Sequence, residues 1–182
     1  MNQRDKWLLC DKDDLLKDCR VDAYKSPGPG GQRKNKVETA IRLVHKPSGL
    51  SAQGQATRSQ RQNKSLALRN LQMHIACGLR TPADPEQLEI PAEISECLQP
   101  IGNSASGSAA KMRLTVSTGN RLFWAAAAFV LDVFEASGGK LADAARAIGV
   151  STSNLASFLR RHRALLAAAQ QIRKANGHSP LK

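Results

Sequence analysis

The run Lys-Ser-Pro-Gly-Pro-Gly-Gly-Gln-Arg-Lys-Asn-Lys at residues 25–36 places the tightest limit on how this chain can fold. Its two prolines stiffen the backbone, and the adjacent Gly30 and Gly31 permit backbone angles that are closed to other residues. Gln32 follows with a primary amide, which donates and accepts hydrogen bonds and has no pKa to tune. The run therefore predicts a stiff, glycine-tipped loop that brings one amide close to a ligand.

Positive charge follows the loop tip directly, at Arg33, Lys34 and Lys36. The whole chain has a formal net charge of +12, and residues 25–80 carry eleven Lys or Arg against the single acid Glu38. Such a field is typical of nucleic-acid binding, with an anionic membrane surface or plain solubility as alternatives. Aromatic residues make up only 4% of the chain, which favours recognition of the backbone and shape of folded RNA over base stacking.

Both sides of the loop show strand patterns. Ile41, Leu43 and His45 alternate with more polar residues, as in a strand with one face toward a core. The turn Pro47-Ser48-Gly49 leads into a second alternating run, so the two predict a hairpin. We expect a helix over 12–19, a strand over 21–25, a helical turn over 37–40, and hairpin strands over 41–46 and 50–55.

A long helix is predicted after the hairpin. Ser59 with Gln62 three residues later forms a capping box, and Leu68, Leu71 and Ile75 mark one apolar face down to Gly78. The fold class expected for this part is α+β, a sheet covered on one face by the long helix.

The rest of the chain differs in composition. Residues 81–110 hold five acids, no base and several prolines, which predicts a linker without regular elements. From residue 113 the pattern is helical and basic, and Gly149-Val150-Ser151 sits where a helix-turn-helix would turn. The expected domains are 1–80, a linker over 81–112, and an all-α, helix-turn-helix-like module over 113–182.

Cysteine and histidine spacing predicts no metal site. The four cysteines form no C-x-x-C pair, and none of the four histidines lies at ligand spacing from them. The N-terminus lacks a secretory pattern and no apolar run approaches 18 residues, so we expect a cytoplasmic protein without a membrane partner.

Residues 19–78 resemble the catalytic domain of class I peptide-chain release factors and their ribosome-rescue relatives. The motifs of that family occur here in its order and spacing: Ser26, Gly28, Gly30-Gly31-Gln32, Asn35-Lys36, His45-Lys46-Pro47-Ser48-Gly49, Arg58-Ser59-Gln60 and Asn63-Lys64. The ordered set is far more specific than the tripeptide alone.

The resemblance implies an enzyme, a peptidyl-tRNA ester hydrolase that acts in the peptidyl-transferase centre of the ribosome and needs no cofactor. The backbone N–H of Gln32 would bond the developing oxyanion or the leaving 3′ oxygen, while its side chain shapes the pocket for water. Gly30 and Gly31 would supply the tight turn. Gln32 would also be the substrate of the glutamine methyltransferase that modifies this family.

The resemblance and the charge pattern together name the RNA-contacting residues. The loop cations Arg33, Lys34 and Lys36 are expected on phosphates of 23S rRNA. The other expected contacts are Arg58, Gln60, Arg61 and Lys64 at the start of the long helix, and Arg160, Arg161 and Arg163 in the C-terminal module. Thr152, Ser153 and Asn154 would join them if that module binds RNA, which is expected rather than DNA; a packed bundle with a merely charged surface is an equal alternative.

A chain of 182 residues has room for neither the codon-reading domain nor the N-terminal helical domain of full-length release factors. We therefore expect stop-codon-independent hydrolysis of peptidyl-tRNA, in termination or ribosome rescue. The alternative is a non-catalytic rRNA-binding protein.

Overall fold

The computed structural model describes residues 2–25, 38–101 and 112–181, and divides the chain into two compact units. One unit is Lys6–Ile75, and the other joins Met1–Asp5 to Ala76–Lys182. Strands and helices occur in both, so the predicted α+β class is confirmed.

The first unit is built on an antiparallel sheet. Its elements in chain order are α1 (Gln3–Leu9), α2 (Lys12–Lys17), β1 (Cys19–Tyr24), β2 (Ala40–His45), β3 (Ser51–Gly54) and α4 (Gln60–Gly78), although the first residues of α1 and the last of α4 belong to the other unit. The strands pair in the order β1-β2-β3, and Leu43 in β2 lies opposite Val21 and Ala52. Leu43 and Ala52 are buried, which confirms the predicted hairpin and its inward face.

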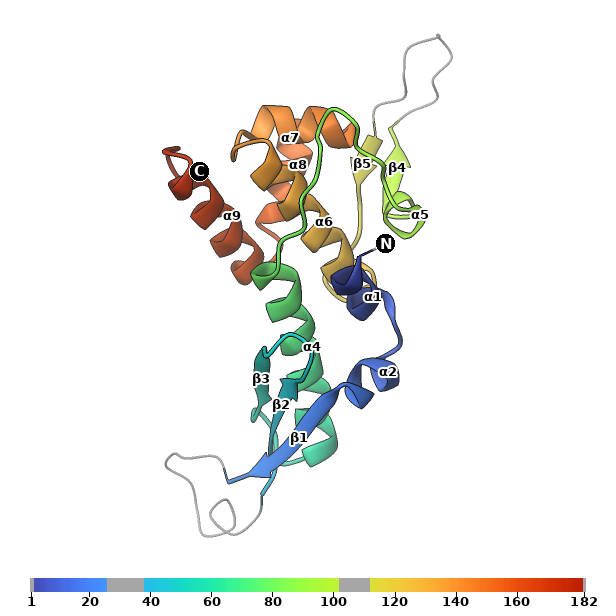
Figure 1. Ribbon diagram of the computed structural model, residues 1–182, viewed down its shortest axis with the longest axis vertical. Coiled ribbons are helices and arrows are strands. Elements are labelled where there is room, and N and C mark those ends of the chain that lie inside the picture. Colours follow the sequence, from blue (N-terminus) through green and yellow to red (C-terminus); the bar gives the residue numbers. More distant parts are fainter. Residues whose placement is uncertain (1, 26–37, 102–111, 182) are drawn as a thin grey trace. The chain divides into compact units, whose positions relative to one another are not determined.

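Helix α4 covers one face of this sheet (Figure 1). Its buried side carries Leu68, Leu71 and Ile75, the face that the sequence predicts. The side-chain oxygen of Ser59 accepts a hydrogen bond from the backbone N–H of Gln62 at 3.3 Å, as expected for the cap.

The helical turn predicted over 37–40 is wrong where the structure describes it. Ala40 is the first residue of β2 and pairs with Tyr24 of β1, and neither Glu38 nor Thr39 is helical. Val37 lies outside the described residues. Pairing with β1 outweighs the weak local preference for a turn.

The second unit contains α5 (Ala92–Ser95), β4 (Leu98–Pro100), β5 (Met112–Leu114), α6 (Phe123–Ala136), α7 (Leu141–Ile148), α8 (Thr152–Leu159) and α9 (Arg163–Ala175). The expectation that prolines exclude regular elements from 81–110 is therefore wrong, since α5 forms and β4 pairs with β5. Pro91 precedes the first turn of α5, where a helix loses nothing by a missing N–H. Ile94 and Cys97 are buried there, and this burial holds the segment in the fold. The domain boundaries at residues 80 and 112 stay a prediction.

The helices of the second unit pack as a bundle. Helix α6 contacts α7 and α9, while α8 contacts α7, α9 and β5. The turn between α7 and α8 uses Gly149, whose φ of 80° lies in the left-handed region, and Ser151 caps α8 through a bond from the N–H of Asn154. This is the predicted helix–turn–helix arrangement.

A buried cluster of charges ties three segments of this unit together. Asp132 of α6 is 6% exposed and accepts hydrogen bonds from Arg4 at 2.8 Å, from the backbone N–H of Thr81 at 3.1 Å and from Arg80 at 3.4 Å. Arg4 also donates to the carbonyl of Leu79 at 3.1 Å. Residues from the N-terminus and from the segment after α4 are thus part of the core around α6.

In the described ranges, no helix is both long and apolar enough to cross a membrane.

Candidate nucleic-acid interface

The residues predicted to carry the chemistry lie outside the described residues. They are Gly30, Gly31, Gln32, Arg33, Lys34 and Lys36, all within the undescribed range 26–37. The structure describes the two strands that flank this range, where Tyr24 of β1 pairs with Ala40 of β2. The segment therefore connects neighbouring antiparallel strands at one end of the sheet.

Asn63 of α4 holds the strand that returns from this segment. Its side chain is fully buried, and its Nδ2 donates to the carbonyls of Thr39 at 2.7 Å and Thr57 at 2.8 Å. Its Oδ1 accepts from the backbone N–H of Thr57 at 3.0 Å. One amide thus fixes the entry to β2 against the start of α4, and Gln60 adds a longer bond of 3.4 Å to the carbonyl of Glu38.

Gly54 lets β3 approach α4 closely at the same place. A Cβ on Gly54 would lie 2.0 Å from the carbonyl oxygen of Asn63 and 2.8 Å from the backbone nitrogen of Ala67. Because both neighbours are helix backbone, they cannot move aside cheaply, and no side chain fits there. The N-terminal turns of α4 are in this way seated directly on the sheet.

Tyr24 holds the strand that enters the segment. Its hydroxyl lies 3.0 Å from Oε1 of Gln53 and 3.2 Å from Oε1 of Gln55, across the sheet at the end of β3. Both strands that flank residues 26–37 are therefore tied by side chains to fixed elements.

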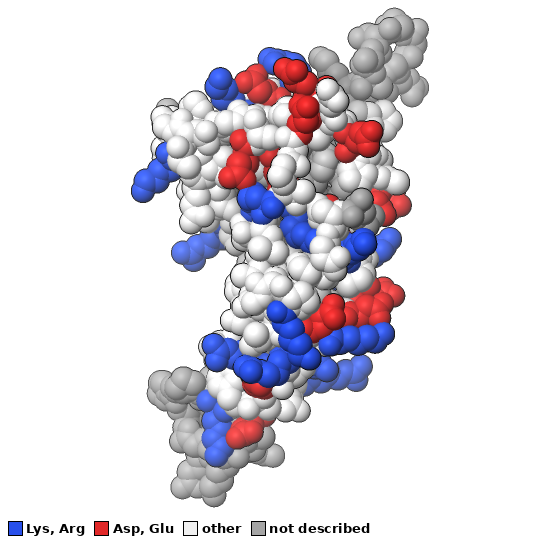
Figure 2. Space-filling view, in the orientation of Figure 1, with Lys and Arg blue, Asp and Glu red and all other residues white. Residues whose placement is uncertain are grey.

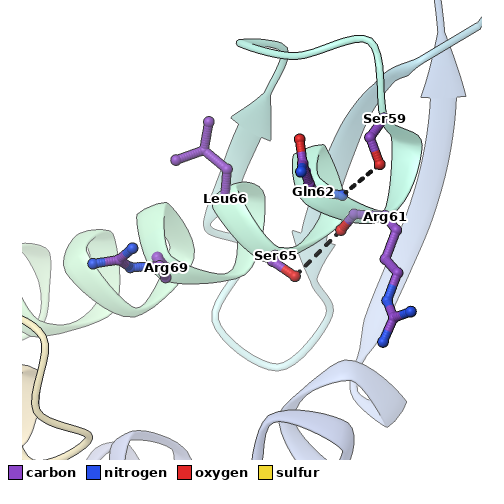
Figure 3. A pocket seen from close by; sticks show the side chains of 6 residues that line it. All are labelled: Ser59, Arg61, Gln62, Ser65, Leu66 and Arg69. Carbon is purple, nitrogen blue, oxygen red and sulfur yellow. Dashed lines mark hydrogen bonds between the residues drawn. The ribbon is translucent and has the colours of Figure 1, made fainter.

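We call the ends of β1 and β2 that flank residues 26–37 the stem. The exposed side of α4 forms a groove next to this stem. Its volume is about 470 Å³, and its lining residues are Ser59, Arg61, Gln62, Ser65, Leu66 and Arg69. In Figure 3 the side chains of Arg61 and Arg69 leave α4 in different directions, with Ser65 between them along the helix. Guanidinium, hydroxyl and amide groups in one shallow groove suit the oxygens of a phosphodiester backbone.

The charge along α4 has one sign. The helix contains no acid, and Arg61, Lys64 and Arg69 are all exposed, as is Arg58 before it. Figure 2 shows Lys and Arg side chains gathered on the unit that holds the sheet, with a smaller acidic group beside them. Of the predicted contacts, Arg61 lies in the groove, whereas Arg58, Gln60 and Lys64 are exposed but do not line it.

Arg69 was missed by the sequence analysis. It lies eight residues after Arg61, with Ser65 halfway, so all three share one face of the helix. This spacing is the signal that would have found it.

His45 has a structural role in this unit. It is fully buried, its Nδ1 lies 2.7 Å from the hydroxyl oxygen of Ser48, and its ring meets the ring of Trp7 edge to face at 4.5 Å. Burial lowers the pKa of His45 below its ordinary value, and the negative charge of Asp18 opposes that shift only in part. The ring packs behind the hairpin turn.

The predicted contacts in the C-terminal module belong to the other unit. Arg160, Arg161 and Arg163 are exposed around the end of α8 and the start of α9. Asn154, by contrast, is used within the fold, because its Oδ1 accepts from the N–H of Leu114 at 2.9 Å and its Nδ2 donates to the carbonyl of Leu114 at 3.3 Å.

Comparison with known proteins links residues 15–117 to one family. The model of the RF-1 domain matches residues 15–117. Peptide chain release factor 1 of Rhodospirillum rubrum is 42% identical over 73 residues, which are 40% of this chain and 21% of that protein. Peptide chain release factor 2 of Sulfurovum sp. is 48% identical over 59 residues, 32% of this chain and 16% of that protein. Peptide chain release factor 1 of Magnetococcus marinus is 40% identical over 73 residues, 40% of this chain and 20% of that protein. The chain thus spans about a fifth or less of the length of these curated relatives.

Proposed function

Because this chain belongs to the RF-1 domain family, we propose that it hydrolyses the ester bond between a nascent peptide and tRNA on the ribosome. The observation that carries the proposal is the match over residues 15–117, which includes the Gly30-Gly31-Gln32 run and the stem on either side of it. Asn63 and Tyr24 hold that stem, and Gly54 lets α4 lie directly on the sheet. A loop that must place one amide needs such a fixed base.

The loop contributes to the reaction by positioning the reacting groups and by presenting polar groups with fixed dipoles. Water attacks the ester carbonyl carbon, the bond to the 3′ oxygen of the tRNA breaks, and that oxygen takes up a proton. The loop tip has no group that ionises near neutral pH, so it does not act as a general base. The backbone N–H of Gln32 stabilises the oxyanion or the leaving oxygen, its side chain confines the water, and the ribosome with its tRNA completes the site.

The cations around the stem dock the unit on rRNA. Arg61 and Arg69 in the groove of α4 meet phosphates of 23S rRNA, together with Arg58, Gln60 and Lys64 beside the groove. The loop cations Arg33, Lys34 and Lys36 make the same kind of contact closer to the reacting ester.

The reaction does not depend on a stop codon in this proposal, and it serves ribosome rescue. The alignments with release factors cover 59 to 73 residues, and the family match ends at residue 117. The chain after residue 117 forms the basic helical bundle of α6 to α9, to which we assign the choice of ribosome. Gln32 is also the proposed target of a glutamine methyltransferase, since it belongs to the Gly-Gly-Gln run that the resemblance marks as the modified site.

Variants of Gln32 test the catalytic claim. Gln32→Pro removes the backbone N–H and is expected to slow peptide release from ribosomes by roughly 100-fold to 1,000-fold, while Gln32→Ala keeps the N–H and loses less. Ribosome affinity should change less than about threefold in both, and the exposed Gln87→Ala serves as control. Equal release by all variants would reject the mechanism. Tight ribosome binding by the unmodified chain without any release would favour the second candidate, a non-catalytic rRNA-binding protein.

A further inference from the structure

One end of the helical bundle collects arginines from two distant stretches of chain. Arg121 stands just before α6, while Arg160 and Arg163 stand at the junction of α8 and α9. All three are exposed. We call these three residues the arginine corner.

Contacts within the unit fix this arrangement. The ring of Trp124, near the start of α6, meets the ring of His162 edge to face at 4.8 Å, just before α9. Figure 1 shows the start of α6 and the start of α9 at the same end of the bundle. Arg161 braces the corner, because it donates to the carbonyl of Val116 and its guanidinium lies 5.9 Å from the ring centroid of Phe158. Arg161 is therefore occupied within the protein and positions its neighbours.

The two stretches of chain that carry the corner contain no acid. Residues 112–131 and 144–181 contain no Asp or Glu. Within the described part of the chain, none of the three arginines of the corner takes part in an ion pair. Three exposed guanidinium groups thus share one end of the bundle and repel one another.

The helix dipoles make the same end more positive. Both α6 and α9 begin at the corner, and the N-terminus of a helix carries a partial positive charge. Acidic residues usually occupy such first turns, yet neither helix has one, and Arg163 is the first residue of α9. Arginines at helix starts oppose the preference for acids in the first turn. Such a placement marks a functional surface, because the stability of the fold alone does not favour it.

We propose that the arginine corner binds the phosphate backbone of RNA, as a second contact surface separate from the groove of α4. Phosphate oxygens form bidentate hydrogen bonds with guanidinium groups, and helix N-termini stabilise anions. One phosphate ligand therefore suits both the arginines and the helix starts of the corner. The half-buried ring of Trp124 lies beside the corner and reports on its occupancy. The choice of RNA over DNA rests on the proposed function.

The position of the corner differs from the usual use of a helix-turn-helix. There the start of the second helix meets the nucleic acid. Here Asn154, in the first turn of α8, holds β5 through both of its amide atoms, and the free cations lie at the opposite end of α8. Ser151, the cap of α8, is likewise bonded to the N–H of Asn154.

The first test measures binding of the full-length protein to a labelled RNA hairpin and to a DNA hairpin of the same sequence. The variant Arg121→Gln/Arg160→Gln/Arg163→Gln should weaken RNA binding by at least about tenfold and reduce the slope of log affinity against log salt by about 2. The control Lys140→Gln/Arg146→Gln/Lys174→Gln removes three exposed cations at other places of the same unit and should change affinity less than about threefold. Equal losses in the two variants, or tighter binding of the DNA hairpin, would overturn the proposal.

The test is independent of peptide release. Gln32→Ala should bind the hairpin as the unmodified chain does, so a failure of catalysis leaves this result standing. In a Trp7→Phe background Trp124 is the single remaining tryptophan, and its emission should change on RNA addition. Emission that stays constant at saturating RNA would place the bound RNA elsewhere.

Thermal unfolding separates RNA binding from a structural role of the arginines. The two roles predict changes in Tm of opposite sign for the same variant. Arg121→Glu/Arg163→Glu places acids at the two helix starts and should raise Tm by roughly 2 °C while it abolishes RNA binding. A fall in Tm would show that the arginines serve the fold.

Discussion

Asn63 links the chemistry of the loop to the framework behind it. Its fully buried amide donates to two carbonyls and accepts from one backbone N–H. A buried amide with three short bonds fixes direction as well as distance. We therefore regard Asn63 as the residue that sets the orientation of β2 where it leaves residues 26–37.

Replacing Asn63 by Ala should lower the free energy of unfolding by about 3 kcal/mol, because it removes three hydrogen bonds made by a fully buried amide. Asn70→Ala is the matched control on the same helix. Asn70 is half-buried and makes one bond, of 2.8 Å, to the carbonyl of Gln53, so its loss should stay below about 1 kcal/mol. Urea unfolding measures both, and equal losses would contradict this role of Asn63.

His45 makes the stability of the first unit depend on pH. Its pKa in the folded protein is lowered by burial, and in the described part of the chain its Nε2 has no acceptor for a second ring proton. Below the ordinary pKa of 6.5 the unfolded chain therefore binds a proton that the folded chain resists. The stability that His45 contributes is complete above 6.5 and is lost as pH falls through the lower pKa of the folded state.

Urea unfolding at pH 8 and at pH 5.5 should show a larger loss of stability for the unmodified chain than for His45→Gln, which cannot take up that proton. The contributions of the carboxylates to the pH dependence of stability are the same in both proteins, so they cancel in the difference. The same pH dependence in both would rule out the buried neutral imidazole.

At the scale of elements, the contact between β3 and α4 is set by the absence of a side chain. Gly54→Ala should cost at least about 3 kcal/mol, since the new Cβ meets the backbone of Asn63 and Ala67 at distances that require the helix to move. Gly78→Ala is the control, because Gly78 has open space around it and stands at the end of the same helix. That change should cost nothing and gain up to about 1 kcal/mol. A tolerated Gly54→Ala would show that α4 does not sit so close.

Residue patterns that are local in the sequence predict most of the helices and strands of the fold. Alternation in β2 and β3 and the cap at Ser59 depend on neighbours in the chain, so local rules find them. The strand β4 escaped the prediction because its three residues gain their stability from β5, which lies beyond an intervening segment. The role of Asn63 is equally invisible, since Thr39 is 24 residues away.

At the scale of the whole molecule, the core of the second unit includes both early and late segments of the chain. Asp132 and Arg4 are 128 positions apart in sequence, and no periodic pattern reports such a pair. Their side chains are each 6% exposed and lie 2.6 Å apart, so each is a main counter-charge of the other. Residues before 113 therefore contribute side chains to the core around α6.

Asp132→Asn should lower the free energy of unfolding by about 3 kcal/mol, because it leaves the guanidinium of Arg4 buried without its main counter-charge. Glu135→Gln is the control one turn along α6, where the carboxylate is 50% exposed and lies 3.8 Å from Arg80. Its loss should be less than about 1 kcal/mol. If the two changes cost the same in urea, the cluster does not hold the unit together.

The central claim is that this chain releases peptides through its loop without reading a codon. The most direct measurement is the rate of peptide release from ribosomes that hold labelled peptidyl-tRNA, on mRNA truncated at the P site, on mRNA extending with a sense codon, and on mRNA extending with a stop codon. The account predicts release that requires Gln32 and is no faster with the stop codon than with the sense codon. Release only on the stop-codon template, or release unchanged in both Gln32→Pro and Gln32→Ala, would contradict it.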